Sequence, residues 1–249
     1  MHPAPRERVP LPRALDAFLI SLFDPACASC GGPLTPDRKG PVCAACWASV
    51  RSVTRPWCAT CGDALGTWRM DQAVQCRHCT LQPPAFDEAR SAAVHADAMR
   101  HIIHALKYGR HVGLAGPLAD LMRQTAGDWL SDAVLVPVPL HTVRLWKRGF
   151  NQAEVLTAAI GVPWMRLLRR RRLGRTQAGL HAAARRRNVA NAYVVRRRYR
   201  RRALPASVIL VDDVVTTGAT ADACARVLKD AGVQTVRVLS AARAVRRSS

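Results

Sequence analysis

The sequence predicts an α/β protein in which a parallel sheet is flanked by helices and preceded by a small cysteine-rich module. Residues 85–249 alternate between strand-like and helix-like hydrophobic patterns, as the units of a parallel sheet do. The run 208–211 is continuously apolar, which is typical of a strand buried on both faces. Residues 26–83, in contrast, are rich in Cys, Gly, Pro and Trp and show little periodicity.

The N-terminal segment, residues 1–25, carries Pro and Arg and a short apolar stretch at 14–23. A signal peptide has a similar pattern, but Asp16 interrupts the stretch and no small-x-small cleavage site follows where one is needed. We therefore predict a lead-in helix and a cytoplasmic protein. The sequence has no apolar run long enough to predict a membrane span.

These shifts in composition predict three parts: a lead-in helix over 1–25, a double zinc ribbon over 26–83 and the sheet domain over 85–249. Pro83 and Pro84 mark the second boundary. Within the sheet domain we expect strands over 89–95, 133–138, 208–211 and 235–239, an edge strand at 194–195, and helices over 98–107, 114–125, 151–160 and 219–231.

Eight of the nine cysteines form four CxxC pairs: Cys27 and Cys30, Cys43 and Cys46, Cys58 and Cys61, and Cys76 and Cys79. Each tight turn brings two thiolates to one ion, and two turns complete a tetrahedral structural zinc site. A disulfide framework is the alternative, but it needs an oxidising compartment that the N-terminal segment does not support. Pairing successive turns predicts two zinc sites, and an interleaved cross-brace remains open.

The formal net charge of +21 indicates a polyanionic partner, nucleic acid foremost. An arginine-rich, GC-biased coding sequence is the other explanation. Much of the charge is concentrated in 166–175, 185–187 and 196–202, and we interpret most of 166–190 as a mobile loop. The candidate nucleic-acid contacts are Arg169, Arg170, Arg171, Arg172 and Arg185.

The segment 208–220, VILVDDVVTTGAT, combines a strand, an acidic pair and a turn of small residues. The strand brings Asp212 and Asp213 to the carboxyl end of the sheet, where open α/β sheets bind ligands. Adjacent carboxylates can accept hydrogen bonds from two neighbouring hydroxyls, as on a ribose. Gly218 and the helix N-terminus after it suit a phosphate monoester. We predict a phosphorylated-sugar site, and an ordinary capped turn with solvated carboxylates is the alternative.

This segment resembles the phosphoribosyl pyrophosphate-binding motif of type I phosphoribosyltransferases. Further motifs make the chain similar to the ComF family of competence-associated proteins, which includes the GntX-like proteins. They are the cysteine pairs, LKY at 106–108, VPVPLHTVRLWKRGFNQ at 136–152 and TQAGLHAAARRRN at 176–188. Ala184 stands where the family often has Glu, and His95 where it often has Tyr; neither departure affects the phosphate turn.

The resemblance implies a phosphoribosyltransferase-type sheet that binds phosphoribosyl pyrophosphate with Mg²⁺ and transfers ribose phosphate to an unidentified acceptor during DNA uptake. It makes Asp212 and Asp213 catalytic, with the ribose hydroxyls as their partners. The loop after strand 133–138 would hold pyrophosphate through Arg144 and Arg148. Lys107 is a further candidate there, unless it only caps a helix. The remaining sugar-phosphate contacts implied are Val214, Thr216, Thr217, Gly218, Ala219 and Thr220.

A non-catalytic factor that binds single-stranded DNA in natural transformation is the alternative function, with the DNA-uptake machinery as a further implied partner. The aromatic content of 5% argues against an extensive base-stacking platform. The basic stretch 166–188 lies where these transferases often carry a flexible catalytic loop that excludes water on closing. Nucleic-acid contact and plain solvation are the alternatives for this stretch.

Overall fold

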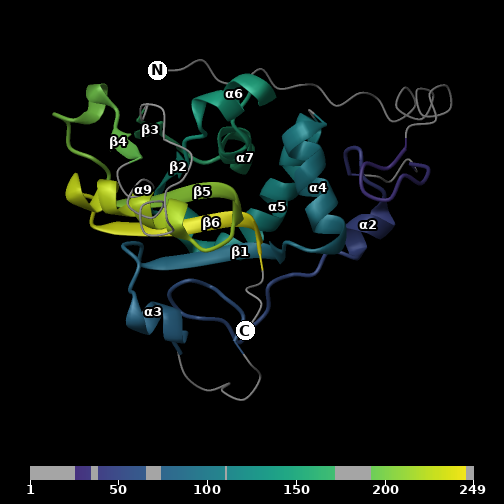
Figure 1. The fold of residues 1–249 in the computed structure, drawn as a ribbon, viewed down its shortest axis with the longest axis horizontal. Helices are drawn as coiled ribbons and strands as arrows, with labels where there is room; N and C mark the ends of the chain where they lie inside the picture. Colours follow the sequence, from purple (N-terminus) through teal and green to yellow (C-terminus); the bar gives the residue numbers. More distant parts are fainter. Residues whose placement is uncertain (1–25, 35–38, 66–73, 110, 172–191, 245–249) are drawn as a thin grey trace, which may run out of the picture.

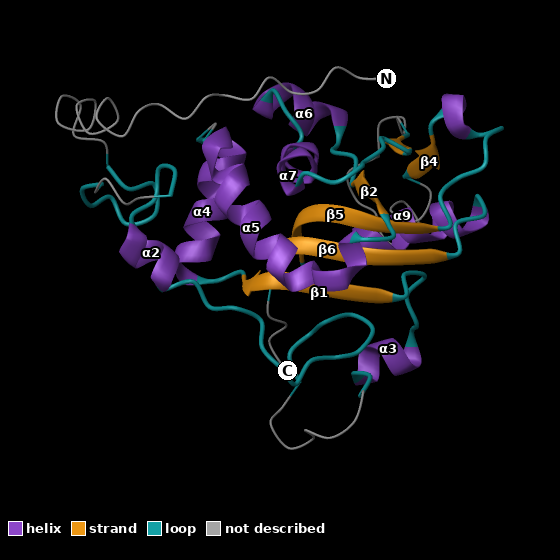
Figure 2. Cartoon of the chain, turned by 180° about the vertical axis from the view of Figure 1, so that it is seen from behind, coloured by secondary structure: helices purple, strands orange, loops and turns teal. Residues whose placement is uncertain are grey.

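The computed structural model describes residues 26–34, 39–65, 74–109, 111–171 and 192–244 (Figure 1). The predicted lead-in helix over 1–25 therefore lies outside the described residues, as do Arg172 and Arg185. The predicted α/β class is confirmed, because a parallel sheet with helices on both faces forms the centre of the molecule (Figures 1 and 2).

In the described part of the chain, the central sheet has four strands in the order β1-β6-β5-β2, and all neighbours are parallel. The strands are β1 (Glu88–Val94), β2 (Val134–Pro137), β5 (Ser207–Val215) and β6 (Thr235–Arg243). Because β6 is the last strand in sequence and lies between β1 and β5, the sheet is completed by the C-terminal end of the chain.

Helices cover both faces of this sheet, so side chains along β5 alternate between two hydrophobic cores. Ile209 and Val211 pack with α4 (Asp97–Tyr108), α5 (Ala115–Ala126) and α7 (Gln152–Ile160). Val208 and Leu210 pack on the other face with α9 (Ala219–Asp230). Burial on both faces explains why this strand is an uninterrupted apolar run in the sequence.

The predicted strands and helices of the sheet domain are found, but β5 and β6 extend further than expected. The prediction that β5 ends at Val211 is wrong, since Asp212 lies beside Ser240 and Val214 beside Ala242 in the continuing ladder. The acidic pair therefore belongs to the strand itself. A short apolar run indicates only the buried middle of a strand. It does not show that the strand continues through polar residues to a cleft.

The interpretation of 166–190 as a loop is wrong for its first residues. Leu168–Arg170 forms β3, which pairs antiparallel with β4 (Tyr193–Val195) in a two-stranded ribbon. Leu168 is buried in the core that includes α9, and this burial holds a strand that is otherwise arginine-rich. Residues 172–191 lie outside the described ranges.

Shorter elements complete the described structure. They are the helices α2 (Ala44–Ala48), α3 (Arg77–Leu81) and α6 (Thr142–Arg148) and the 3-10 turns η1 (Val112–Leu114), η2 (Gly127–Leu130) and η3 (Arg197–Tyr199). None of the helices in the described ranges has the length and apolar character needed to cross a membrane.

The cysteine-rich segment packs directly on the sheet domain. Its first half contributes Cys27 and Val42 to the core under α4 and α5, and its second half contributes Cys58 to the core under α9. Along the outer edge of β1, the Val94 N–H donates to the Arg51 carbonyl at 2.8 Å and the Ala89 N–H to that of Thr60 at 2.7 Å. Each of the two hydrophobic cores therefore contains residues from both the cysteine-rich segment and the sheet domain. The domain limits 26–83 and 85–249 stay a prediction.

Candidate functional site

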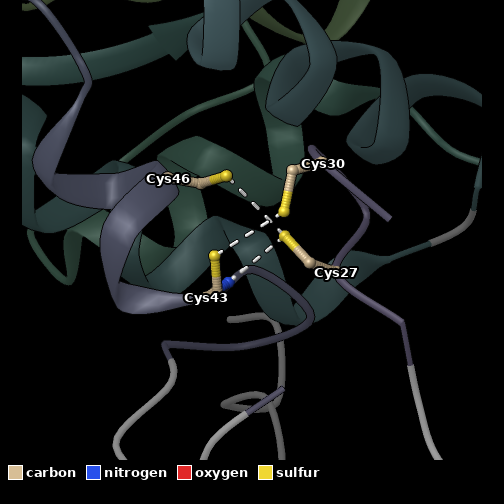
Figure 3. A group of neighbouring side chains, drawn as sticks. All are labelled: Cys27, Cys30, Cys43 and Cys46. Carbon is tan, nitrogen blue, oxygen red and sulfur yellow. Dashed lines mark hydrogen bonds between the residues drawn. The ribbon is translucent and has the colours of Figure 1, made fainter. Parts of the chain in front are cut away.

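The cysteine pairs form two four-sulfur clusters in sequential order, and Figure 3 shows the first of them. One holds Cys27, Cys30, Cys43 and Cys46, and the other Cys58, Cys61, Cys76 and Cys79. The sulfurs of Cys30 and Cys43 are 3.9 Å apart, and those of Cys61 and Cys76 are 3.7 Å apart. Four ligands around zinc at a normal Zn–S length lie about 3.8 Å from each other, so both clusters fit tetrahedral zinc. The cross-brace is thereby excluded.

Backbone N–H groups in each knuckle point at a sulfur and favour its thiolate form. The Cys43 N–H donates to Cys27 Sγ at 3.3 Å, and the Cys76 N–H donates to Cys58 Sγ at 3.3 Å. Burial opposes ionisation of Cys27, but hydrogen bonds from the backbone N–H groups of Cys43, Cys30 and Ser29 and from the Cys30 side chain lower its pKa to about 6. Hydrogen bonding from the Cys61 thiol is the main cause that lowers the pKa of Cys58 to about 4. Thiolates are the form that binds zinc.

The second candidate site is a cleft of about 340 Å³ at the carboxyl ends of β2 and β5. A smaller hollow of about 50 Å³ adjoins it and is formed by the turn between β5 and α9. The cleft is lined by Lys107, Arg144, Arg148, Asp212, Asp213, Val214, Thr216 and Thr220 among others. The hollow adds Thr217, Gly218 and Ala219. The structure thus brings together every residue that the resemblance assigned to the sugar phosphate.

The acidic pair lies beside one cation at the bottom of the cleft. Lys107, in the last turn of α4, has its Nζ 2.9 Å from Asp213 Oδ1 and neutralises this carboxylate. Asp212 Oδ1 accepts a hydrogen bond from the Asp213 N–H at 2.9 Å. Burial, followed by repulsion from Asp213, raises the pKa of Asp212 to about 7, against the opposing effects of that N–H and Lys107.

The turn after β5 has the backbone that an anion requires. Gly218 has φ +82°, a left-handed conformation that favours glycine, and it precedes the first residue of α9. The Phe86 ring lies against this turn, at 3.8 Å from the place where a Cβ on Gly218 would stand. The N-terminus of a twelve-residue helix thus opens into the hollow.

The predicted pyrophosphate loop is a helix, α6, and this part of the prediction is wrong. His141 caps it by accepting from the Val143 N–H at 3.2 Å, and Gly149 ends it with φ +79°. Gly149 is a C-cap signal in the sequence, but His141 is not a preferred N-cap residue, and a helix of seven residues shows little periodicity. Arg144 and Arg148 still line the cleft, from the first and last turns of α6.

Two neighbours hold the Arg148 guanidinium at the mouth of the cleft. It donates to Gln152 Oε1 at 2.8 Å and to the Tyr108 hydroxyl at 2.9 Å, and it stacks 4.8 Å from the Tyr108 ring centroid. The arginine is therefore oriented before any ligand arrives.

Sequence reasoning gave too little weight to Gln152. Its side chain is 1% exposed and lines the cleft, and its Nε2 has no hydrogen-bond partner in the described residues. A buried amide donor without a partner is costly, and a ligand oxygen in the cleft would satisfy it. Asn151 caps α7, since its side-chain oxygen accepts a hydrogen bond from the Ala153 N–H at 3.1 Å.

The predicted nucleic-acid arginines in and beside β3 do not all lie on the same face. Arg170 lines the cleft and stacks 5.6 Å from the Tyr193 ring, whereas Arg169 and Arg171 are exposed. Strand alternation directs neighbouring side chains to opposite faces, which a loop interpretation does not anticipate. Their role in nucleic-acid binding stays a prediction.

Comparison with known proteins supports the double zinc ribbon and the resemblance to the ComF family. A family model described as a double zinc ribbon domain matches residues 18–80. The chain is 30% identical over 244 residues to Competence protein F of Haemophilus influenzae, covering 91% of this chain and all of that protein. It is 32% identical over 227 residues to DNA utilization protein YhgH of Salmonella typhi, covering 85% and 94% of the two chains.

Among solved structures, orotate phosphoribosyltransferase from Aeropyrum pernix is similar over 62% of this chain and 80% of that one. The TM-score is 0.33 and the identity 18%.

The parallel sheet, the cleft at its carboxyl edge and the two four-cysteine clusters define an α/β protein with a double zinc ribbon. Its relatives cover nearly the whole chain. The chain belongs to the ComF family of competence-associated proteins.

Proposed function

We propose that the cleft binds phosphoribosyl pyrophosphate with Mg²⁺ and that the protein transfers ribose phosphate from it to an acceptor, releasing pyrophosphate. One observation carries this proposal: a glycine turn at a helix N-terminus, an acidic pair and two arginines line adjoining hollows at the carboxyl edge of one sheet. Each group matches a different part of the ligand, namely the 5-phosphate, the ribose hydroxyls and the pyrophosphate.

In this proposal, Asp212 and Asp213 accept hydrogen bonds from the ribose hydroxyls and stabilise the positive charge that develops on the sugar. Arg144 and Arg148 neutralise the pyrophosphate as it leaves. Among the described residues that line the cleft, Asp212 and Asp213 supply the carboxylates, so a bound Mg²⁺ would take most of its oxygen ligands from the pyrophosphate and water. The ion would spread the negative charge of the leaving group.

Isothermal titration with phosphoribosyl pyrophosphate and Mg²⁺ tests the site. We expect binding by the wild type and at least a tenfold loss in Asp213→Asn, because the variant loses a charged hydrogen-bond acceptor. Asp230→Asn, an exposed carboxylate at the far end of α9, is the matched control and should bind like the wild type. Lack of binding by the wild type would refute the proposal.

Turnover needs a separate measurement, since a site that holds the donor does not by itself transfer the sugar. Pyrophosphate release with a panel of nucleobases and with single-stranded DNA would identify the acceptor class. Two relatives are named for competence and DNA utilization. We therefore propose DNA uptake as the context, with the DNA-uptake machinery as a partner. The cytoplasmic location stays a prediction.

Replacing Gln152 with methionine, which has a similar volume, should weaken phosphoribosyl pyrophosphate binding about tenfold while protein stability is kept or raised. The variant removes the buried Nε2 that lacks a partner in the described structure, and this gain in stability offsets the loss of the hydrogen bond that Arg148 donates to Gln152 Oε1 at 2.8 Å. Titration and thermal melting measure the two effects, and unchanged affinity would show that the ligand does not reach Gln152.

A further inference from the structure

A second, open hollow of about 560 Å³ lies beside the cleft, between the end of α4 and α6. We call it the α4–α6 groove; its lining residues are Lys107, Tyr108, Arg144, Lys147 and Arg148. Four of these five are cations, and no carboxylate in the described residues lines the groove. Figures 1 and 2 both show α6 beside the C-terminal end of α4, across the sheet from α3.

The rim of this groove exposes large apolar side chains. Trp146 is 84% exposed, and Val143 is 54% exposed one helical turn before it. Tyr108, in the groove itself, is 60% exposed. Along α6 the cations at 144, 147 and 148 share one face, and Val143 and Trp146 form the adjoining stripe. A tryptophan left this open beside a cationic groove favours a ligand that is both anionic and flat.

The chemistry of this surface selects among partners. An apolar protein segment would bring no counter-charge to Arg144, Lys147 and Arg148, whereas Lys107 already pairs with Asp213. Binding to a membrane surface would require a larger apolar face than the two exposed side chains of one short helix. A single nucleic-acid strand offers phosphates at regular intervals and unpaired bases whose faces can stack on an aromatic ring. A duplex offers the same phosphates, but its bases are already stacked on each other.

We propose that the α4–α6 groove binds single-stranded DNA, with a base stacked on Trp146 and phosphates paired with Lys147 and Arg144. Lys107, Arg144 and Arg148 line both this groove and the cleft. The strand and phosphoribosyl pyrophosphate therefore compete for the same cations. The competition, and the choice of DNA over RNA, rest on the proposed function; strand binding in the groove does not.

Fluorescence anisotropy with a labelled single-stranded oligodeoxynucleotide tests the groove. We expect binding that falls as salt rises, and a loss of about tenfold in Trp146→Ala, the stacking contribution of one base. Lys147→Ala should also weaken binding. Leu81→Ala is the matched control, since Leu81 is 68% exposed on α3 and far from the groove. Trp146→Ala should keep wild-type affinity for phosphoribosyl pyrophosphate.

Three outcomes would overturn the proposal. If the wild type does not bind the strand, or if Trp146→Ala and Lys147→Ala bind it like the wild type, the groove is not the site. If saturating phosphoribosyl pyrophosphate leaves strand binding unchanged, the two ligands do not compete for the shared cations. If an oligoribonucleotide of the same sequence binds as tightly, the assignment to DNA is wrong. Strand binding without any binding of phosphoribosyl pyrophosphate would refute the proposed function alone.

Discussion

Cys58→Ser should lose one of the two zinc ions and lower the melting temperature of the whole chain, because the second cluster is part of the core under α9. Cys58 is fully buried in this hydrophobic core, which also contains Phe86 and Val236. Structural zinc contributes on the order of 10 kcal/mol to the folding of small zinc modules. We expect the sheet domain to lose a part of this, several kcal/mol, since its own core remains.

The link from this cluster to the sheet is an ion pair near the end of β6. Arg243 is 3% exposed, donates to the Cys61 carbonyl at 2.7 Å and lies 3.1 Å from Asp63. When the knuckle around Cys61 unfolds, this guanidinium is left buried without its partners, which costs about 3–5 kcal/mol. The loss of stability therefore reaches β6, the neighbour of β5 in the sheet.

Metal analysis of the purified protein and thermal melting measure this prediction together. Cys224→Ser is the control, because it makes the same exchange at a buried cysteine outside both clusters. It should destabilise modestly and keep both zinc ions. A Cys58→Ser variant with full zinc content, or with an unchanged melting temperature, would contradict the integration of the second cluster into the sheet core.

Asp212→Asn should stabilise the ligand-free protein above neutral pH. The pKa of Asp212 is raised to about 7, mainly by burial and then by Asp213, whereas an unfolded aspartate titrates near its normal value of about 4. The folded state thus binds a proton that the unfolded state has released. Stability from this group is fully present below pH 4 and is lost as the pH rises through about 7. The total is about 4 kcal/mol.

Urea unfolding of the wild type and of Asp212→Asn at a series of pH values between 4 and 8.5 measures this effect. The stability difference between the two proteins should grow in favour of the variant as the pH rises. Asp230→Asn, whose carboxylate is exposed, controls for the change in net charge. A constant difference across the series would mean that Asp212 titrates normally. The same carboxylate is expected to ionise more readily when a cation accompanies the ligand.

The sequence predicted the central sheet well because its strands are long enough to carry a clear signal. The apolar run at 208–211 and the glycine turn after it identify β5, the start of α9 and the hollow formed between them. The CxxC spacing likewise identified all eight ligands of the two clusters. In both cases the local pattern and the tertiary structure require the same residues, so local reasoning is sufficient.

Features that depend on distant contacts were not predictable in this way. The strand at Leu168–Arg170 exists because Leu168 is buried and β4 pairs with it, while its own composition indicates a solvated loop. The short helix α6 depends on its caps more than on any periodicity. The importance of Gln152 rests on an orphaned donor, which is a property of the folded environment and has no signature in the residue itself.

The place of β6 in the sheet has a consequence for how the protein is made. The ribosome releases β1 and β5 before β6, the strand that lies between them, so neither can pair with β6 until residues 235–243 have emerged. Asp63 likewise cannot pair with Arg243 until that residue emerges, 180 positions later. A nascent chain can therefore load zinc well before it completes this sheet. A stop codon before Thr235 would leave two open strand edges, which are prone to aggregate.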